Sequence, residues 1–240
     1  SGTIKNYDGS MTHATCQFPP TTSDQNLCTR YQYDDVSNQI LITDTVGHQT
    51  YTFYNEVNRA VGKVTNWQGT ISDLSDCQYP PTEPDKDLCT LYEHDEVGQV
   101  IVTTDPLGRQ TRTFYDALGR KMGEVVNWQP GFTLDDCVLS ADNLSQTNVC
   151  TLYEYDKVGN RTVLINALGQ KTLTVYDALN RSVATIANWD GVTEIEDADE
   201  CAGLPATAEQ NICSVTDYDA LGRTLQATDA LGNISTQAYD

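Results

Sequence analysis

The chain has 240 residues, and hydrophobic residues make up 39% of it. That share supports a buried core and argues against wholesale disorder. The 34 acidic residues against 14 Lys and Arg give a formal net charge of −20, so the chain would repel phosphate backbones and anionic membrane surfaces. We therefore expect no nucleic acid as a partner. Membrane insertion is not expected either, because no stretch reaches the roughly 18 apolar residues of a membrane span.

In chain order, short runs rich in Thr, Val, Ile and Tyr predict β-strands, for example at 39–43, 50–54 and 172–176. They often alternate with period two, which is typical of a strand with two different faces. No comparable stretch sustains a helical period. Strand, turn and strand recur every ten or eleven residues, which predicts antiparallel hairpins laid side by side.

A four-residue pattern separates the strands: Asp or Asn, any two residues, then Gly or Asn. The first side chain can accept backbone N–H bonds, and the fourth residue tolerates positive φ. We therefore expect positive φ at Gly119, Gly169 and Gly222. The structural turn residues predicted in this way are Asp105, Gly108, Asp116, Gly119, Gly169, Asp177, Asp219, Gly222, Asp229 and Gly232.

The chain is an internal repeat. Cys28, Cys89, Cys150 and Cys213 lie 61, 61 and 63 residues apart, and the turn aspartates and an Asn-Trp pair recur in step with them. This spacing predicts one repeat array over residues 1–240, built of about four units of ~61 residues. The approximate units are 1–66, 67–127, 128–188 and 189–240, with Asn6-Tyr7 as the divergent first Asn-Trp pair.

The sequence Tyr-Asp-Ala-Leu-Gly-Arg stands at 115–120 and 218–223, with Tyr-Asp-Ala-Leu-Asn-Arg at 176–181. This motif resembles the Rhs or YD repeat of bacterial Rhs proteins, of toxin-complex B and C components and of teneurins. The resemblance implies an all-β fold in which antiparallel hairpins form a spiral sheet, a YD-repeat β-solenoid or tube. Two features depart from the family pattern: the insert after each Asn-Trp pair, and degraded motifs such as His94-Asp95.

The eight cysteines fall into two per unit, twelve or thirteen residues apart. We expect a disulfide within each unit: Cys16–Cys28, Cys77–Cys89, Cys137–Cys150 and Cys201–Cys213. Such bonds indicate an oxidising, extracellular setting. Structural zinc is the competing interpretation, but it favours close cysteine pairs such as C-x₂₋₄-C, and no pair here has that spacing.

Other recurring side chains allow a structural interpretation, and the tyrosines also allow a functional one. Tyrosines two apart, as at 31 and 33 or at 153 and 155, could form aromatic ladders or a platform for sugars. We expect Trp67, Trp128 and Trp189 to anchor the inserts on the sheet. The arginines that end the turns, Arg59, Arg120 and Arg181, should pair with turn aspartates or carbonyls.

Neither catalysis nor a cofactor is expected. His13, His48 and His94 occupy three different repeat phases, and no nucleophile motif flanks them. The acidic run 194–200 lacks the order of an EF-hand loop, so we expect a solvated loop, with weak Ca²⁺ binding as the alternative. Asn143, Asn160 and Asn233 stand in glycosylation acceptor sequences, which matter only if the source can glycosylate them.

These observations predict a structural, secreted repeat protein that forms a β-tube, filament or wall with one disulfide per repeat. A fragment of an encapsulating Rhs, toxin-complex or teneurin-like shell, or an adhesin that binds carbohydrate, are the alternatives. The expected partner is the protein itself, as a continuous array or a head-to-tail polymer, with glycans as an alternative partner. Because Asp240 stops at the Tyr-Asp of a further turn, we also expect a window of a longer array.

Overall fold

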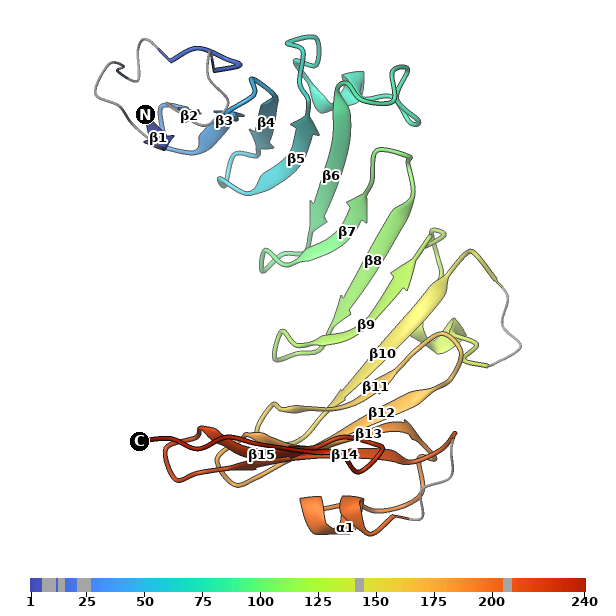
Figure 1. The fold of residues 1–240 in the computed structure, drawn as a ribbon. Coiled ribbons are helices and arrows are strands. Elements are labelled where there is room, and N and C mark those ends of the chain that lie inside the picture. The colour runs from blue at the N-terminus through green and yellow to red at the C-terminus, as the bar shows by residue number, and fades with distance from the viewer. Residues whose placement is uncertain (6–11, 13–15, 21–26, 141–144, 205–208) are drawn as a thin grey trace. The chain divides into compact units, whose positions relative to one another are not determined.

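The computed structural model describes residues 1–5, 12, 16–20, 27–140, 145–204 and 209–240 (Figure 1). The chain divides into two compact units, Ser1–Arg112 and Thr113–Asp240. Apart from two 3-10 turns and one short helix, the regular structure described is β-strand. Each strand of the sheet lies beside the strand that precedes it in sequence, and the registered pairs are antiparallel.

In the first unit the sheet begins with the following strands. They are β1 (Gly2–Lys5), β2 (Leu27–Tyr33), β3 (Gln39–Thr43), β4 (Gln49–Tyr54), β5 (Ala60–Thr65), β6 (Leu88–His94), β7 (Val100–Thr104) and β8 (Gln110–Tyr115). The division between the units falls within β8. A 3-10 turn, η1 (Leu74–Asp76), lies in the segment between β5 and β6.

The second unit repeats this plan. Its strands are β9 (Lys121–Val126), β10 (Val149–Tyr155), β11 (Arg161–Ile165), β12 (Lys171–Tyr176), β13 (Ser182–Trp189), β14 (Ile212–Tyr218), β15 (Thr224–Thr228) and β16 (Ile234–Thr236). The 3-10 turn η2 (Leu134–Asp136) precedes β10, and the α-helix α1 (Ala198–Ala202) precedes β14.

The strands end on two opposite sides of the sheet, here called its edges, and the connections on these two sides differ. At one edge every connection is a five-residue YD turn, such as 116–120 between β8 and β9. At the other edge short turns, such as 105–109, alternate with long inserts that run over 66–87, 127–148 and 190–211. We call these the insert-free edge and the insert edge.

Buried side chains lie on the sheet face that the inserts cover, and Ile195 and Cys201 of the third insert are buried with them. In β5 the burial alternates, so that Gly62 and Val64 are buried while their neighbours are partly exposed. Val64 pairs with Cys89 on β6, and Val125 pairs with Cys150 on β10. All four of these Val and Cys side chains are at most 2% exposed. One face of each hairpin pair is thus covered by the disulfide-closed insert that follows it.

The all-β class and the side-by-side antiparallel hairpins predicted from the sequence are confirmed. One local expectation needs correction: the acidic side chains of the run 194–200 are exposed as expected, but the run is not a loop throughout, because α1 begins at Ala198. Asp197 caps the helix by accepting the backbone N–H of Glu200 at 2.8 Å, and Cys201 on the helix is fully buried. A capping side chain and one buried residue per turn suffice for a helix too short to show a period.

We predict that Gly222→Val lowers the free energy of unfolding by about 1–3 kcal/mol. Gly222 has φ 82°, and a Cβ added there would meet no atom within 4 Å, so the cost is backbone strain alone. Gly222→Asn is the matched control and should cost much less, because Asn180 holds φ 60° at the same turn position. Chemical denaturation measures both variants, and equal stability of the two would contradict the turn geometry.

Candidate functional site

The YD turn is held by the side chain at its first position. In the turn 116–120, one carboxylate oxygen of Asp116 accepts the backbone N–H groups of Leu118 and Arg120, both at 2.9 Å. The backbone N–H of Gly119 donates to the Asp116 carbonyl at 2.9 Å, and Gly119 has φ 78°. A left-handed residue at this position closes a tight antiparallel hairpin, which explains the Gly or Asn of the motif.

The other turn residues predicted from the sequence lie in the same geometry. The glycines at the fourth position have φ between 76° and 82°: Gly108, Gly169, Gly222 and Gly232. The aspartates at the first position accept the corresponding pair of backbone N–H groups: Asp105, Asp177, Asp219 and Asp229.

The tyrosine that precedes each turn reaches across the sheet. Tyr155, at the end of β10, donates its hydroxyl to the Lys121 carbonyl at 2.8 Å, and Tyr218 donates to the Ser182 carbonyl at 3.0 Å. Both acceptors are the first residue of the preceding strand. The register shifts at each of these tyrosines, so its hydroxyl supplies a hydrogen bond at the place where the ladder is irregular.

The arginine that ends a turn joins one repeat to the next. Arg120 donates from Nε to Asp116 at 2.7 Å and from Nη1 to the Asp156 carbonyl at 3.3 Å. Its guanidinium also lies 4.7 Å from the ring centre of Tyr155, within cation–π range. We call this threefold contact with its own turn, the next tyrosine and the next turn the arginine clasp.

The clasp recurs one repeat later. Arg181 donates to Asp177 at 2.6 Å and to the Asp219 carbonyl at 3.0 Å, and its guanidinium lies 4.9 Å from the ring centre of Tyr218. In the first unit His94 replaces the tyrosine, and Arg59 donates to the carbonyls of Asp95 and Glu96. The predicted pairing of these arginines with turn aspartates or carbonyls is therefore present.

Each insert is closed at its neck and pinned by its tryptophan. The Asn127 carbonyl accepts the Asn148 N–H at 3.0 Å, and both residues have positive φ. The indole N–H of Trp67, Trp128 or Trp189 donates to the carbonyl four residues later, at 2.8 to 2.9 Å. Trp67 also lies 4.8 Å from the ring centre of Tyr51 on β4, so it anchors its insert on the sheet.

Four disulfides close the inserts with the pairing predicted from the repeat: Cys16–Cys28, Cys77–Cys89, Cys137–Cys150 and Cys201–Cys213. In two inserts a leucine of the 3-10 turn fills the space above a glycine on the sheet. A Cβ on Gly62 would overlap Leu74, and one on Gly123 would lie 2.7 Å from Leu134. Ala184 stands at the equivalent position of the third repeat, where α1 replaces the 3-10 turn.

Residues 94–127, from the end of β6 to the neck of the second insert, match the RHS repeat family model. The chain contains an RHS repeat. The resemblance to the Rhs or YD-repeat family inferred from its tyrosine–aspartate motifs is thereby confirmed.

Two solved structures share the fold of this RHS-repeat chain. One is the Photorhabdus luminescens Tc holotoxin pore, with a TM-score of 0.52 and 14% identity. The other is TcdB2-TccC3 without its hypervariable C-terminal region, with a TM-score of 0.51 and 15% identity. Each alignment covers 88% of this chain and 9% of the other chain. No curated protein sequence matches the chain.

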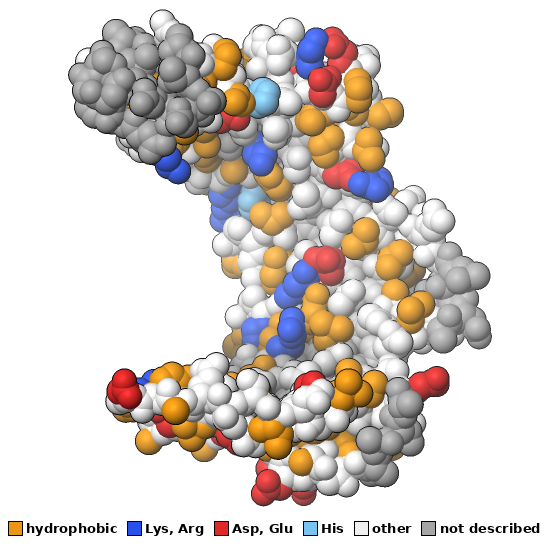
Figure 2. All heavy atoms as spheres, in the orientation of Figure 1, with side chains coloured by type: hydrophobic (Ala, Val, Ile, Leu, Met, Phe, Trp, Pro, Cys, Tyr) orange, Lys and Arg blue, Asp and Glu red, His pale blue; other side chains and the backbone are white. Residues whose placement is uncertain are grey.

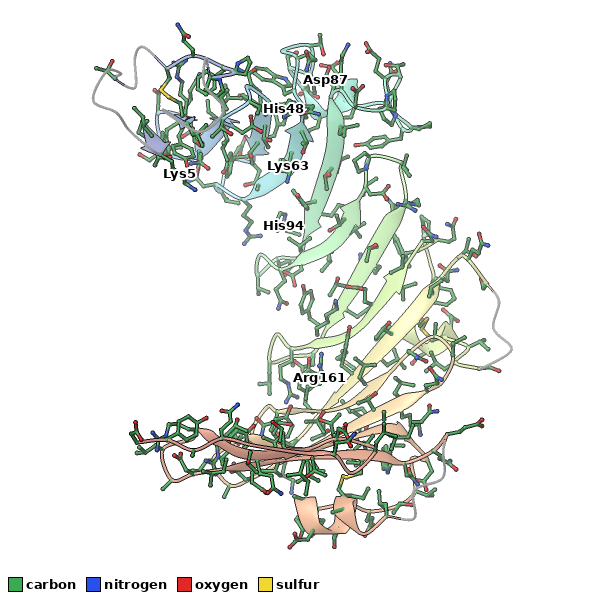
Figure 3. The ribbon with its side chains drawn as sticks, viewed as in Figure 1. Lys5, His48, Lys63, Asp87, His94 and Arg161 are labelled. Atoms are coloured by element: carbon green, nitrogen blue, oxygen red, sulfur yellow. A yellow bond between two sulfur atoms is a disulfide. The ribbon has the colours of Figure 1, made fainter. Side chains whose placement is uncertain are left out.

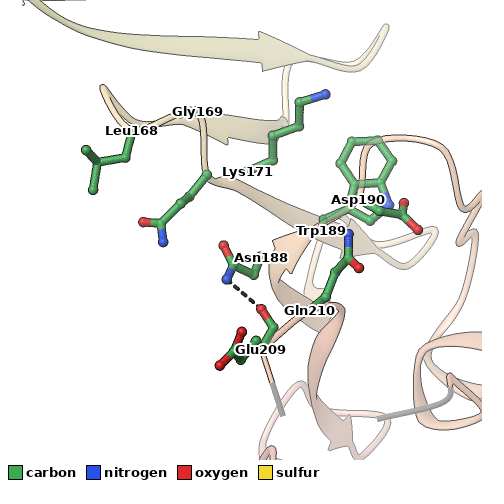
Figure 4. Close-up of a pocket in the computed structure, with 9 residues that line it drawn as sticks. Leu168, Gly169, Lys171, Asn188, Trp189, Asp190, Glu209 and Gln210 are labelled. Atoms are coloured by element: carbon green, nitrogen blue, oxygen red, sulfur yellow. Dashed lines mark hydrogen bonds between the residues drawn. The ribbon is translucent and has the colours of Figure 1, made fainter. Parts of the chain in front are cut away.

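The second unit also carries an open groove of about 770 Å³ beside the neck of the third insert (Figure 4). The turn residues 168–170 form one side. Lys171, Trp189 and Asp190 contribute side chains, and the Asn188 amide donates to the Glu209 carbonyl at 2.6 Å. The groove therefore combines one indole with amide and charged groups.

The remaining sites predicted from the sequence are placed as follows. The Asn160 amide donates to Asp156, and the Asn233 amide donates to Asp229, both at 2.8 Å, so both side chains take part in turns. Asn143, His13 and Asn6-Tyr7 lie outside the described residues. Within the described part of the chain, no group of three or more His, Cys, Asp or Glu is arranged to hold a metal ion. No helix described there is long and apolar enough to span a membrane.

The tyrosine pair at 153 and 155 lies against cations. Tyr153 has Lys121 and Arg161 at 5.5 and 5.4 Å from its ring centre, and Tyr155 has Arg120. Sequence reasoning missed that the arginine of one turn serves the tyrosine of the next. The signal was present, since Tyr, Asp and Arg recur together at 115–120, 176–181 and 218–223.

Hydrogen bonds stabilise the ionised form of carboxylates in the turns and at the neck of the third insert. Hydrogen bonds from the guanidinium and the backbone N–H of Arg181 lower the pKa of Asp177 from its ordinary value of 3.8. The backbone N–H of Arg120 has the same effect on the pKa of Asp116. At the neck of the third insert, the Thr193 hydroxyl and backbone N–H lower the pKa of Asp190 strongly.

We predict that acid destabilises the fold through these carboxylates. Because the folded pKa of Asp177 lies below its unfolded value, its contribution is present above the unfolded pKa and is lost as the pH falls through the folded pKa. Asp177→Asn keeps a turn acceptor but removes the titration, so Tm should fall less steeply below about pH 5. Asn166→Asp is the reciprocal variant and should steepen the fall. Parallel curves for wild type and both variants would contradict this role.

Peptide mapping under non-reducing conditions should recover Cys77 linked to Cys89. Replacing both by serine should lower the free energy of unfolding by about 3 kcal/mol, because the bond closes a loop of this length. The three remaining disulfides are the internal control in the same map. A link from Cys89 to a cysteine of another repeat, or a double variant as stable as the wild type, would contradict the assignment.

Proposed function

We propose that this chain is a stretch of structural wall in a secreted RHS-repeat protein. The arginine clasp carries the proposal. It uses the polar groups of the YD motif to bind each repeat to the next, through Arg120 to Asp156 and through Arg181 to Asp219. Because the donors and acceptors of this motif bond one another within the sheet, the motif has a structural role rather than a role in ligand recognition.

Of the possible walls, an encapsulating shell fits better than a filament. The two Tc structures that share this fold support a shell, and the chain spans 9% of the matching chain in each. The wall would be a strip of hairpins wound into a spiral, and its neighbours would be further stretches of the same strip. The four disulfides support an extracellular place for it, since such bonds persist in oxidising compartments.

A structural role also agrees with where the histidines lie. His48 ends a short turn on the insert edge, whereas His94 ends β6 at the insert-free edge (Figure 3). Its neighbour Asp95 holds a YD turn by accepting the backbone N–H of Gln99 at 2.8 Å. These two histidines therefore cannot share one catalytic centre, and we propose that the wall is not an enzyme.

Negative-stain microscopy of the native, full-length protein tests the shell. We expect compact hollow particles that survive at neutral pH and open when the disulfides are reduced. Uniform filaments, or an elongated particle without an enclosed space, would overturn the shell.

The groove beside Trp189 favours a second candidate, a carbohydrate-binding adhesin. Sugars stack on aromatic faces, and the side chains of Lys171 and Glu209 line the same groove and would orient a ring. A glycan array with the wild-type chain and Glu209→Ala tests this candidate, since Glu209 engages its neighbour through the backbone and not the side chain. This candidate function requires that the wild-type chain bind a glycan on the array and that Glu209→Ala weaken this binding.

A further inference from the structure

The third repeat differs from the first two in the charges beside the neck of its insert. The residue that begins the strand after the short turn is Gln49 in the first repeat, Gln110 in the second and Lys171 in the third. The short turn before Lys171 is uncharged, and within it the Asn166 amide donates to the Gln170 side chain at 2.8 Å. The third repeat therefore places a cation where the other two carry an amide.

Cations near the corresponding place in the other two repeats have a carboxylate partner. In the first repeat Lys86 is paired with Glu83 at 2.6 Å, and in the second Arg109 is paired with Asp105 at 2.6 Å. Among the described residues no carboxylate is paired with Lys171. Its charge is therefore available to a ligand in the groove that it lines.

The ammonium of Lys171 is positioned over the start of the third insert. It lies 5.8 Å from the ring centre of Trp189, within cation–π range. A Cβ on Gly191 would overlap the Lys171 Nζ, so the glycine leaves the room that the ammonium occupies. At Gly69, near the start of the first insert, an added Cβ would meet no atom within 4 Å. The third repeat thus brings a cation and an indole together in one groove.

The groove also holds an available carboxylate. Glu209 is exposed and serves the neck through its backbone carbonyl, and its side chain has no hydrogen-bond or ion-pair partner in the part of the chain that the structure describes. The Asp190 carboxylate is different, because its oxygens accept hydrogen bonds from Thr193 and from the Asn211 amide. The groups left for a ligand are therefore one ammonium, on Lys171, and one carboxylate, on Glu209.

Recognition at this groove depends on individual charged groups rather than on a broad basic surface. The chain carries a formal net charge of −20, and Figure 2 shows Lys and Arg side chains in small groups among hydrophobic and uncharged ones. At an ionic strength of about 0.15 M, charges are screened beyond about 8 Å, so distant carboxylates do not keep an anion from the groove. A ligand anion must therefore contact the Lys171 ammonium directly.

A sugar that carries a carboxylate satisfies both available groups. An ammonium only donates hydrogen bonds and pairs with a carboxylate, whereas an ionised carboxylate only accepts them and suits sugar hydroxyls. A neutral sugar would supply hydroxyls to Glu209 but no charge to Lys171. A cationic sugar would bring a like charge to the ammonium.

We propose that the groove beside Trp189 binds a uronic acid, a sugar whose exocyclic carbon is a carboxylate, as a unit of an acidic polysaccharide. Lys171 pairs with the sugar carboxylate and sets the preference for acidic over neutral sugars. Glu209 accepts sugar hydroxyls and contributes to the binding of both. This inference rests on the carbohydrate-binding function proposed above as the second candidate, and it names the ligand class of that site.

Calorimetric titration of the 240-residue chain with its disulfides intact tests the ligand class. The probes are trisaccharides of glucuronic acid and of galacturonic acid, each beside its carboxyl-reduced, neutral form. Wild type should bind at least one acidic trisaccharide at least tenfold more tightly than the neutral form. K171Q gives the third repeat the residue of the other two and should abolish this preference while keeping the affinity for the neutral form.

The matched control is K157Q, which removes one positive charge from an exposed position in a YD turn on the insert-free edge and should keep the preference. Circular dichroism confirms that each variant is folded, and K171M serves if K171Q is not. Equal affinity for acidic and neutral forms, or a preference that K171Q keeps or K157Q loses, would overturn the inference and leave the adhesin in place. Failure to bind any glycan would overturn both.

Discussion

The structure depends on one interaction, in which a side-chain oxygen accepts the turn's backbone N–H groups that have no backbone acceptor. Each YD turn would leave the N–H groups of its third and fifth residues without an acceptor, and one oxygen of Asp116 accepts both. Asn166 does the same with an amide oxygen, so the acceptor matters more than the charge. The second oxygen of the aspartate is then left to hold an arginine, as Asp116 holds Arg120. Arg59 reaches the next turn even though its own turn begins with Asn55.

The residues of one YD motif therefore act in two neighbouring turns and not in one. The aspartate and the glycine act within the turn, whereas the tyrosine and the arginine act across 34 to 38 residues of sequence. Replacing Tyr by His94 removes the phenol hydroxyl but not the arginine's bonds to the next turn. The arginine contact consequently tolerates loss of one component, which a purely local turn motif would not.

How well the sequence predicts a feature depends on how far apart in the sequence the interacting residues lie. Strands, turns and disulfide pairing depend on residues close in sequence or on a fixed repeat, and these were predictable. The hydrogen bond from Tyr155 to Lys121 was not predictable, because it depends on a register shift that the residue types at 154 and 155 do not indicate. Helix α1 was missed for a similar reason: Ala184 takes the room that Gly62 and Gly123 leave for a leucine, and that exchange is visible only when the repeats are compared at this position.

The inserts 66–87 and 127–148 each reach onto the short turn that follows, and this gives the array a direction. Tyr79 lies against Gly108, twenty-nine positions later in the chain, so the first insert acquires its support only after the next hairpins have formed. A growing chain would thus complete its repeats with a delay of half a unit, each one finished by its successor. Loss of a hairpin would expose the insert before it while leaving the one after it closed. We therefore expect such an array to unfold directionally, because the loss of one repeat removes support from the insert before it.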